Sequence, residues 1–209
     1  MAAVVTRVRR VDPVRPEPAV LRIAAQTLRA GGVVAFPTET FYGLAAGLSS
    51  VGGVARVFSV KGREATKPIL VLVDSTVMVE SLAEKVSDTA RALMARHWPG
   101  ALTLVFPARS GVPAAVTAGT GTIGIRWPGH AVAVGLVRAL GEPVTAPSAN
   151  PSQATPPRTS EEVLGYFDGA LELVLDGGPT PGGAPSTVLD VTVEPPRVLR
   201  RGAVVVDLG

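Results

Sequence analysis

The chain has 209 residues, of which 46% are hydrophobic and 18% are charged, so it can bury a core and lies outside the disordered class. Its net charge of +3 and pI of about 9.8 fit either a slightly basic surface or attraction to anions such as nucleotides or RNA. The absence of cysteine excludes disulfides, thiolate metal sites and a cysteine nucleophile, and two histidines argue against a histidine-rich metal centre.

The beginning of the chain shows no targeting signal. Its first 15 residues alternate valine with arginine and lack the apolar core of a signal peptide. No stretch reaches the roughly 18 uninterrupted apolar residues of a membrane span. We therefore expect a cytoplasmic protein with no membrane contact.

Helical and strand patterns interleave along the chain. Apolar residues at helical spacing predict helices at 17–30, about 50–60, 76–84, 87–97 and 130–140, and after Thr159. Short apolar runs predict strands at 33–36, 69–73, 101–106, 122–126, 143–146, 171–175, 187–193 and 197–200. Because several strands follow one another without a helix, we expect an α/β fold with a twisted, mixed, open sheet and flanking helices.

Polar residues mark the expected helix starts. Helix N-caps are predicted at Ser49 or Ser50, at Ser87 and at Thr159. His130 follows Pro-Gly and is interpreted as another cap, and His97 as a packed residue at a helix end. The pattern leaves open whether the Arg-Val-Arg-Arg start at 7–10 folds onto the domain.

The loop at 36–44 directly follows a predicted strand. It carries two threonine hydroxyls, the Glu39 carboxylate and the Tyr42 phenol beside a glycine. It fits either a capped turn over a packed aromatic ring or a loop whose hydroxyls, Thr40 among them, hold a small polar substrate.

A basic segment follows at 61–68. Lys61, Arg63 and Lys67 place three cations within seven residues, between a predicted helix and a predicted strand. The segment fits either a solvated basic turn or a clamp for a triphosphate. The spacing of a Walker A loop is absent.

The strand at 122–126 ends in an arginine. Since side chains alternate along a strand, Thr122, Gly124 and Arg126 share one face. An arginine at the end of an apolar strand needs an anionic partner. Either a ligand carboxylate or a structural Asp or Glu would serve.

Further polar groups follow the later strands. Ser148 and Asn150 come just after the strand at 143–146, where open α/β sheets usually bind ligands. Ser186 lies in a glycine-hinged loop, and Arg200 adds a further basic residue near the end of the chain. Acidic residues form no metal-binding pattern, so no all-protein metal site is expected. Mg²⁺ carried by ATP would not need one.

These segments, taken in order, resemble the threonylcarbamoyl-AMP synthase family, the YrdC-like proteins. The matching motifs are Pro37–Thr40 with Tyr42–Leu44, Lys61–Arg63, Trp98–Gly100, Thr122–Arg126 with Pro128 and His130, Ser148–Asn150, Pro185–Thr187, and Leu199–Arg200 with Gly202. The resemblance covers residues 17–204 and implies a single YrdC-like catalytic domain over 1–209. Longer relatives carry a second, C-terminal domain, which we do not expect in this chain.

The resemblance also implies a basic cleft and a set of site residues. ATP would face Lys61, Arg63, Lys67, Thr122, Ser148, Asn150 and Arg200. Threonine or its carbamate would face Thr40, Arg126 and Ser186. Some relatives have a threonine-contacting histidine where this chain has Leu72.

The implied activity is synthesis of threonylcarbamoyl-AMP and pyrophosphate from L-threonine, bicarbonate and ATP with Mg²⁺. Lys61 and Arg63 would be catalytic through charge neutralisation. The product would pass to a tRNA threonylcarbamoyl transferase complex for N6-threonylcarbamoyladenosine modification at position 37, with weak tRNA binding. Two alternatives stay open: a carbamoyl-transfer enzyme of the same fold, and an RNA-binding or ribosome maturation protein.

Overall fold

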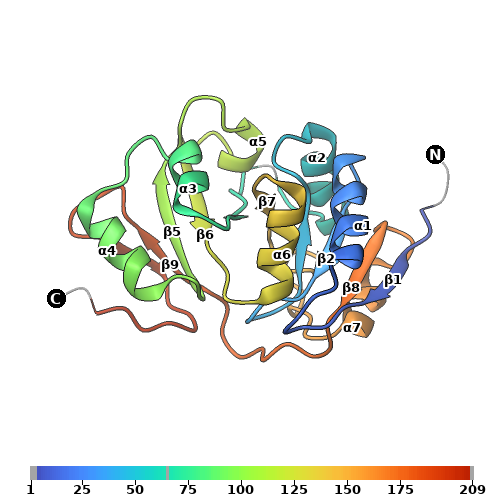
Figure 1. Ribbon diagram of the computed structural model, residues 1–209. Coiled ribbons are helices and arrows are strands. Elements are labelled where there is room, and N and C mark those ends of the chain that lie inside the picture. Colours follow the sequence, from blue (N-terminus) through green and yellow to red (C-terminus); the bar gives the residue numbers. More distant parts are fainter. Residues whose placement is uncertain (1–3, 65, 208–209) are drawn as a thin grey trace.

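The computed structural model describes residues 4–64 and 66–207 (Figure 1). The helices are α1 (Pro18–Arg29), α2 (Val51–Lys61), α3 (Thr76–Leu82), α4 (Asp88–His97), α5 (Ala114–Thr117), α6 (Ala131–Leu140) and α7 (Ser160–Phe167). The strands are β1 (Arg7–Arg10), β2 (Val34–Phe36), β3 (Gly43–Ala45), β4 (Val71–Leu72), β5 (Leu102–Pro107), β6 (Thr122–Arg126), β7 (Val144–Thr145), β8 (Leu173–Asp176), β9 (Thr187–Asp190) and β10 (Arg197–Arg200).

The strands form two open sheets that mix parallel and antiparallel pairs. The four-stranded sheet has the order β1-β8-β2-β3, and the six-stranded sheet has the order β10-β9-β5-β6-β4-β7. The mixed, open α/β architecture predicted from the sequence is confirmed, but as two sheets where one was expected. Isolated bridges, Gly43 to Ser148 and Gly47 to Val144, join them. Pro147 has no N–H to extend the pairing beside Ser148 into a ladder.

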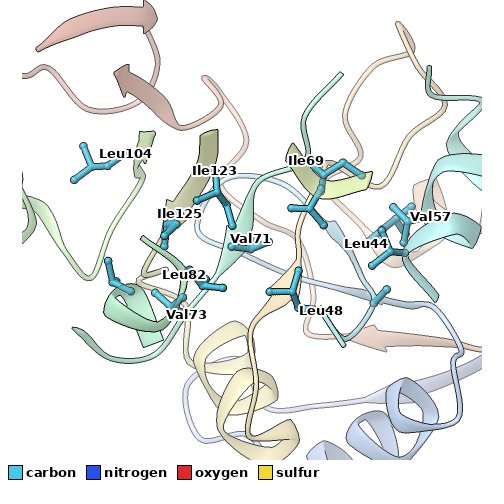
Figure 2. Packing of buried hydrophobic residues seen from close by; sticks show 14 of the residues in the cluster. Leu44, Leu48, Val57, Ile69, Val71, Val73, Leu82, Leu104, Ile123 and Ile125 are labelled. Atoms are coloured by element: carbon cyan, nitrogen blue, oxygen red, sulfur yellow. The ribbon is translucent and has the colours of Figure 1, made fainter. Parts of the chain in front are cut away.

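Helices α1 and α6 pack together, with α6 near the middle of the molecule and α1 beside β2 and β8 in Figure 1. Their apolar faces form one core cluster with residues of β2, β7 and β8. The helices approach closely at Gly135, where an added Cβ would lie 2.7 Å from Leu21 Cδ1. The larger cluster, part of which is drawn in Figure 2, packs against the six-stranded sheet and extends to α2. Each of the two core clusters therefore contains residues of both sheets and joins them.

Most predicted elements are confirmed, with shorter strands at β4 and β7. The Ser50, Ser87 and Thr159 side chains each accept an N-cap hydrogen bond, and His130 Nδ1 accepts one from the Val132 N–H. The sequence analysis missed β1, β3 and the single turn α5. The exposed start at 7–10 does fold onto the domain, because β1 pairs in parallel with β8.

None of the helices within 4–64 and 66–207 combines the length and the hydrophobicity needed to span a membrane.

Candidate active site

A cavity of about 460 Å³ lies where the two sheets meet. Its wall comes from the loop between β2 and β3, the segment after α2, strands β4, β5, β6, β9 and β10, and the residues after β7. Seven of the ten predicted site residues line it: Thr40, Arg63, Thr122, Arg126, Ser148, Ser186 and Arg200. Lys61, Lys67 and Asn150 do not.

The alternation predicted for β6 is confirmed. Thr122, Gly124 and Arg126 all face the cavity, while Ile123 and Ile125 point into the hydrophobic core. Thr103 and Val105 of the antiparallel neighbour β5 face the same way. The sheet therefore presents one face to the cavity, and this face carries polar groups at Thr103, Thr122 and Arg126 among apolar residues.

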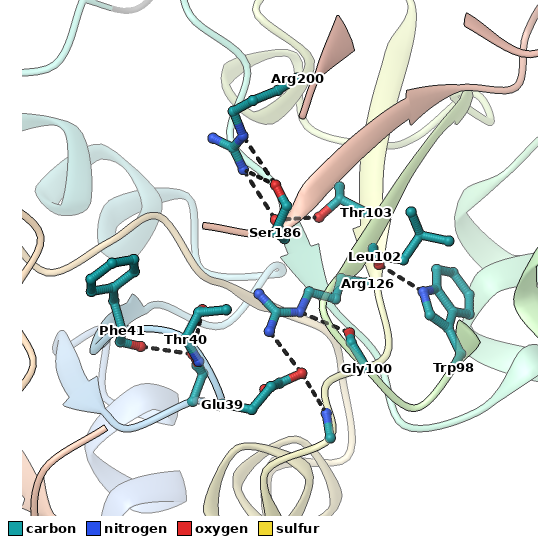
Figure 3. A network of polar contacts seen from close by, with 12 residues as sticks. Glu39, Thr40, Phe41, Trp98, Gly100, Leu102, Thr103, Arg126, Ser186 and Arg200 are labelled. Carbon is teal, nitrogen blue, oxygen red and sulfur yellow. Dashed lines mark hydrogen bonds and ion pairs between the residues drawn. The ribbon is translucent and has the colours of Figure 1, made fainter. Parts of the chain in front are cut away.

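Arg126 is buried, with 4% of its surface exposed. Its Nε–H donates to the Gly100 carbonyl at 3.1 Å, and its Nη2 lies 2.7 Å from Glu39 Oε1 (Figure 3). At that distance the pair is ionic, although its angle falls outside that of a hydrogen bond. Of the two partners that the sequence left open for Arg126, the structure therefore contains the protein carboxylate.

Glu39 Oε1 also accepts a hydrogen bond from the Gly129 N–H at 2.7 Å. Burial favours the neutral carboxyl group, but the Arg126 charge and the Gly129 N–H outweigh it and lower the pKa of Glu39. Glu39 is therefore ionised at neutral pH. The sequence analysis noted its carboxylate in the loop but did not pair it with Arg126, since nothing local links residues 87 positions apart.

Arg200 lies on the far side of the same face. Its guanidinium donates to the Ser186 carbonyl at 2.9 and 3.1 Å and to Ser186 Oγ at 3.1 Å. Ser186 Oγ also lies 2.9 Å from Thr103 Oγ1. Burial and the charge of Arg126 lower the pKa of Arg200, so the two guanidinium groups are close enough to repel. An anionic ligand at Arg200 would ease that repulsion.

The Thr38–Thr40 turn presents an acceptor to the cavity. Thr38 Oγ1 donates to the Phe41 carbonyl at 2.7 Å and accepts from the Thr40 N–H at 3.1 Å. With its one hydrogen used, Thr38 Oγ1 accepts the Thr40 hydroxyl hydrogen across 3.0 Å. The lone pairs of Thr40 Oγ1 are then available for an N–H group of a ligand.

Lys61 lies beneath the wall of the cavity. It is 3% exposed, and its Nζ donates to the Ser148 carbonyl at 2.5 Å and the Asn150 carbonyl at 2.6 Å. Burial, with the charge of Arg63, lowers the pKa of Lys61 to about 8. Asn150 turns its amide to the carbonyls of Pro151 and Ala154. Lys61 thus ties α2 to the Ser148–Asn150 loop, and one of its three ammonium donors is left for another acceptor.

The remaining basic segment lies at the surface. Arg63 lines the cavity, and its guanidinium donates to the carbonyls of Lys67 and Pro68 at 3.3 and 2.7 Å. Lys67 instead pairs with Glu64 at 3.4 Å and leaves 51% of its side chain exposed. Leu72 lines the cavity as an apolar residue.

The three arginines suit the arrangement to an anionic ligand, but it offers no activated nucleophile. Among the described residues that line the cavity, the charged ones are Arg63, Arg126 and Arg200, with no histidine or carboxylate. Over the same described ranges, no three His, Cys, Asp or Glu side chains cluster as metal ligands. His97 ends α4, away from the cavity wall. Any group transfer here would depend on nucleophiles supplied by the ligands.

Comparisons with known proteins match this chain over most of its length. A family model for Sua5, YciO and YrdC proteins, described as "Telomere recombination", matches residues 26–202. Threonylcarbamoyl-AMP synthases of Pyrococcus abyssi and Bacillus subtilis are 42% and 41% identical over 182 residues, 87% of this chain and 54% and 53% of theirs. A crystal structure of P. abyssi Sua5 with L-threonine superimposes with a TM-score of 0.91 at 41% identity, over 94% of this chain and 57% of that one. The chain thus spans about half the length of these relatives.

Proposed function

The chain belongs to the Sua5–YciO–YrdC family, and on that basis we propose that it is a threonylcarbamoyl-AMP synthase. It would form threonylcarbamoyl-AMP and pyrophosphate from L-threonine, bicarbonate and ATP. The names of the P. abyssi and B. subtilis relatives support this activity, as does the L-threonine complex of the Sua5 protein.

One observation carries the proposal: two arginines from separate strands face one cavity that also contains hydroxyl acceptors. Arg126 and the Thr40 hydroxyl form a pair suited to the carboxylate and amine of an amino acid. Arg63 and Arg200, with Thr122 and Ser148, form a second polar group suited to a nucleotide triphosphate. Ser186 lies between them and is proposed to contact threonine or its carbamate.

The chemistry needs no side-chain nucleophile. The threonine amine nitrogen forms a bond to the carbon of bicarbonate and water leaves, which gives N-carboxythreonine. A carboxylate oxygen of that species then attacks the α-phosphorus of ATP, and the bond to the β-phosphate oxygen breaks to release pyrophosphate. The arginines hold the two anions in contact and neutralise the charge that develops on the phosphates.

Lys61 and Arg63 are the residues that we propose to be catalytic. Arg63 faces the cavity directly, whereas Lys61 would contribute its remaining N–H and hold the Ser148–Asn150 loop in place. Asn150 would then contribute as part of that loop.

Magnesium is proposed as a companion of the ATP phosphates. The described cavity wall supplies no carboxylate cluster to hold it. Transfer of the product to a tRNA threonylcarbamoyl transferase complex, for modification of adenosine 37, is proposed from the family, as is weak tRNA binding. A cytoplasmic location stays a prediction.

The test is mass spectrometry of the nucleotide products. The protein is incubated with ATP, Mg²⁺, L-threonine and carbon-13 bicarbonate, with threonine or bicarbonate omitted as controls. We expect labelled threonylcarbamoyl-AMP that requires both co-substrates. Intact ATP, or ATP cleavage that ignores threonine, would refute the proposal. Consumption of carbamoyl phosphate would then favour carbamoyl transfer, and salt-dependent RNA binding without turnover would favour an RNA-binding protein.

A further inference from the structure

The arginines that line the cavity differ in the protein groups that they contact. Arg126 has the carboxylate of Glu39 at 2.7 Å, so its positive charge is largely cancelled. Arg200 and Arg63 donate to neutral groups instead, namely the carbonyl and hydroxyl of Ser186 and the carbonyls of Lys67 and Pro68. One end of the cavity is therefore close to neutral and the other is cationic.

Glu39 is placed to act on Arg126 and not on a ligand. It is absent from the described cavity wall, and its Oε2 is buried with no hydrogen-bond partner among the described residues. His130 lies close enough to sense its charge, but burial lowers the pKa of His130, which is therefore neutral at pH 7. Arg126 is the charged partner that balances this carboxylate (Figure 3).

We propose that Glu39 sets the specificity of the cavity by cancelling the charge of Arg126, so that this end accepts a zwitterionic amino acid and rejects polyphosphate. The inference rests on the proposed function for the identity of the amino acid. A zwitterion has no net charge and needs directional donors, which the fixed guanidinium supplies. Pyrophosphate carries several negative charges, and the Glu39 carboxylate behind Arg126 repels them.

The proposed role predicts a change in competition between two small ligands. L-Threonine is titrated into the wild type and into Glu39→Gln by calorimetry, with and without inorganic pyrophosphate. In the wild type, pyrophosphate should leave the threonine Kd within about twofold, because the two ligands occupy different ends. In Glu39→Gln, where the amide keeps the acceptor but not the charge, pyrophosphate should raise the apparent threonine Kd about tenfold.

Three further variants separate charge from structure. Glu172→Gln is the matched control, because Glu172 also bridges an arginine, Arg56, and a backbone N–H, that of Val33, outside the cavity. It should behave as the wild type. Glu39→Asp keeps the charge and should also resist pyrophosphate. The double variant Glu39→Gln/Arg126→Gln should bind one pyrophosphate per chain, as the wild type does, because the uncompensated cation is gone.

Two results would overturn the role of Glu39: competition in the wild type or in Glu39→Asp, or equal behaviour of Glu39→Gln and the wild type. The first is measurable even if Glu39→Gln does not fold. If the wild type binds no threonine and makes no adenylate, the proposed function fails separately. The number of pyrophosphates bound per chain, one in the wild type and two in Glu39→Gln, would still test the charge balance.

Discussion

The two sides of the cavity are built differently. One side is a sheet face. Thr122 and Arg126 lie on β6, which pairs with β5, and Arg126 donates to the Gly100 carbonyl. Ser186 directly precedes β9, and its hydroxyl bonds to Thr103. The other side is the segment after α2, of which residues 62–64 and 66–68 are described. Most of these are exposed, and the Arg63 guanidinium bonds to the carbonyls of Lys67 and Pro68. We therefore expect the sheet side to keep its geometry when a ligand binds and the loop side to adjust.

This difference assigns different tasks to the two sides. Hydrogen-bond donors in fixed positions discriminate best between small ligands. When a wrong ligand fails to make a hydrogen bond, a rigid site cannot move to restore it. A segment with few buried contacts opens at low free-energy cost, as the entry of the proposed nucleotide would require. The comparison therefore predicts that damage to the sheet side costs both stability and activity, and that damage to the loop side costs activity alone.

The strongest test of the sheet side is Arg126→Gln. Removing the guanidinium leaves the Glu39 carboxylate buried without its counter-ion, which should lower the free energy of unfolding by about 3–5 kcal/mol. The threonine kcat/KM should fall about 100-fold. Urea unfolding and initial-rate kinetics measure the two effects.

Arg56→Gln provides the reference for that variant. Its ion pair with Glu172 is partly exposed, so the loss should be nearer 1 kcal/mol, with activity unchanged. Equal destabilisation by the two variants would mean that the cavity pair is no more important to the fold than an ordinary ion pair.

Lys61→Met tests the contact between α2 and the Ser148–Asn150 loop. The substitution leaves the Ser148 and Asn150 carbonyls without their donor, so we expect a loss of about 1–3 kcal/mol and of most activity. The wild type should also gain stability relative to the variant as the pH rises from about 8 towards 10.5. In that window the unfolded lysine is protonated and the buried one is not.

Chemical denaturation of both proteins between pH 7 and pH 10.5 measures this difference. A constant difference across that range would show that Lys61 stays fully charged in the folded protein.

The contrast between the regular sheet face and the irregular segment after α2 also explains how much of the site the sequence predicts. Strand alternation correctly placed Thr122 and Arg126 on one face of β6, because side chains alternate along a strand, and the structure shows that this face borders the cavity. The pairing of Arg126 with Glu39 needed the three-dimensional contact. Composition grouped Lys61 and Lys67 together, yet helix α2 turns Lys61 inward and the following segment leaves Lys67 exposed. Strand β3 was missed because three residues in a glycine-containing loop carry no alternation.

Arg63→Ala tests the loop side. Its guanidinium is bonded to carbonyls within five residues, so the fold should lose less than about 1 kcal/mol. The ATP kcat/KM should fall about 10- to 100-fold, because a charged donor to the phosphates is removed. Kinetics with ATP varied at saturating threonine measure this. A rise in the threonine KM instead would place Arg63 at the amino-acid end and erase the distinction between the two sides.

Lys67→Ala should have the smallest effect and gives the finest test of the loop. The Lys67 ammonium is paired with Glu64 at 3.4 Å, half of its side chain is exposed, and it does not line the cavity. An exposed pair of this kind contributes at most about 1 kcal/mol, so stability should be unchanged within error and the ATP kcat/KM within about twofold. The comparison with Arg63→Ala, four residues away, makes the result informative. If Lys67→Ala instead loses tenfold or more, the segment must close over the nucleotide and bring Lys67 to the phosphates, since no rigid placement in this structure could produce that loss.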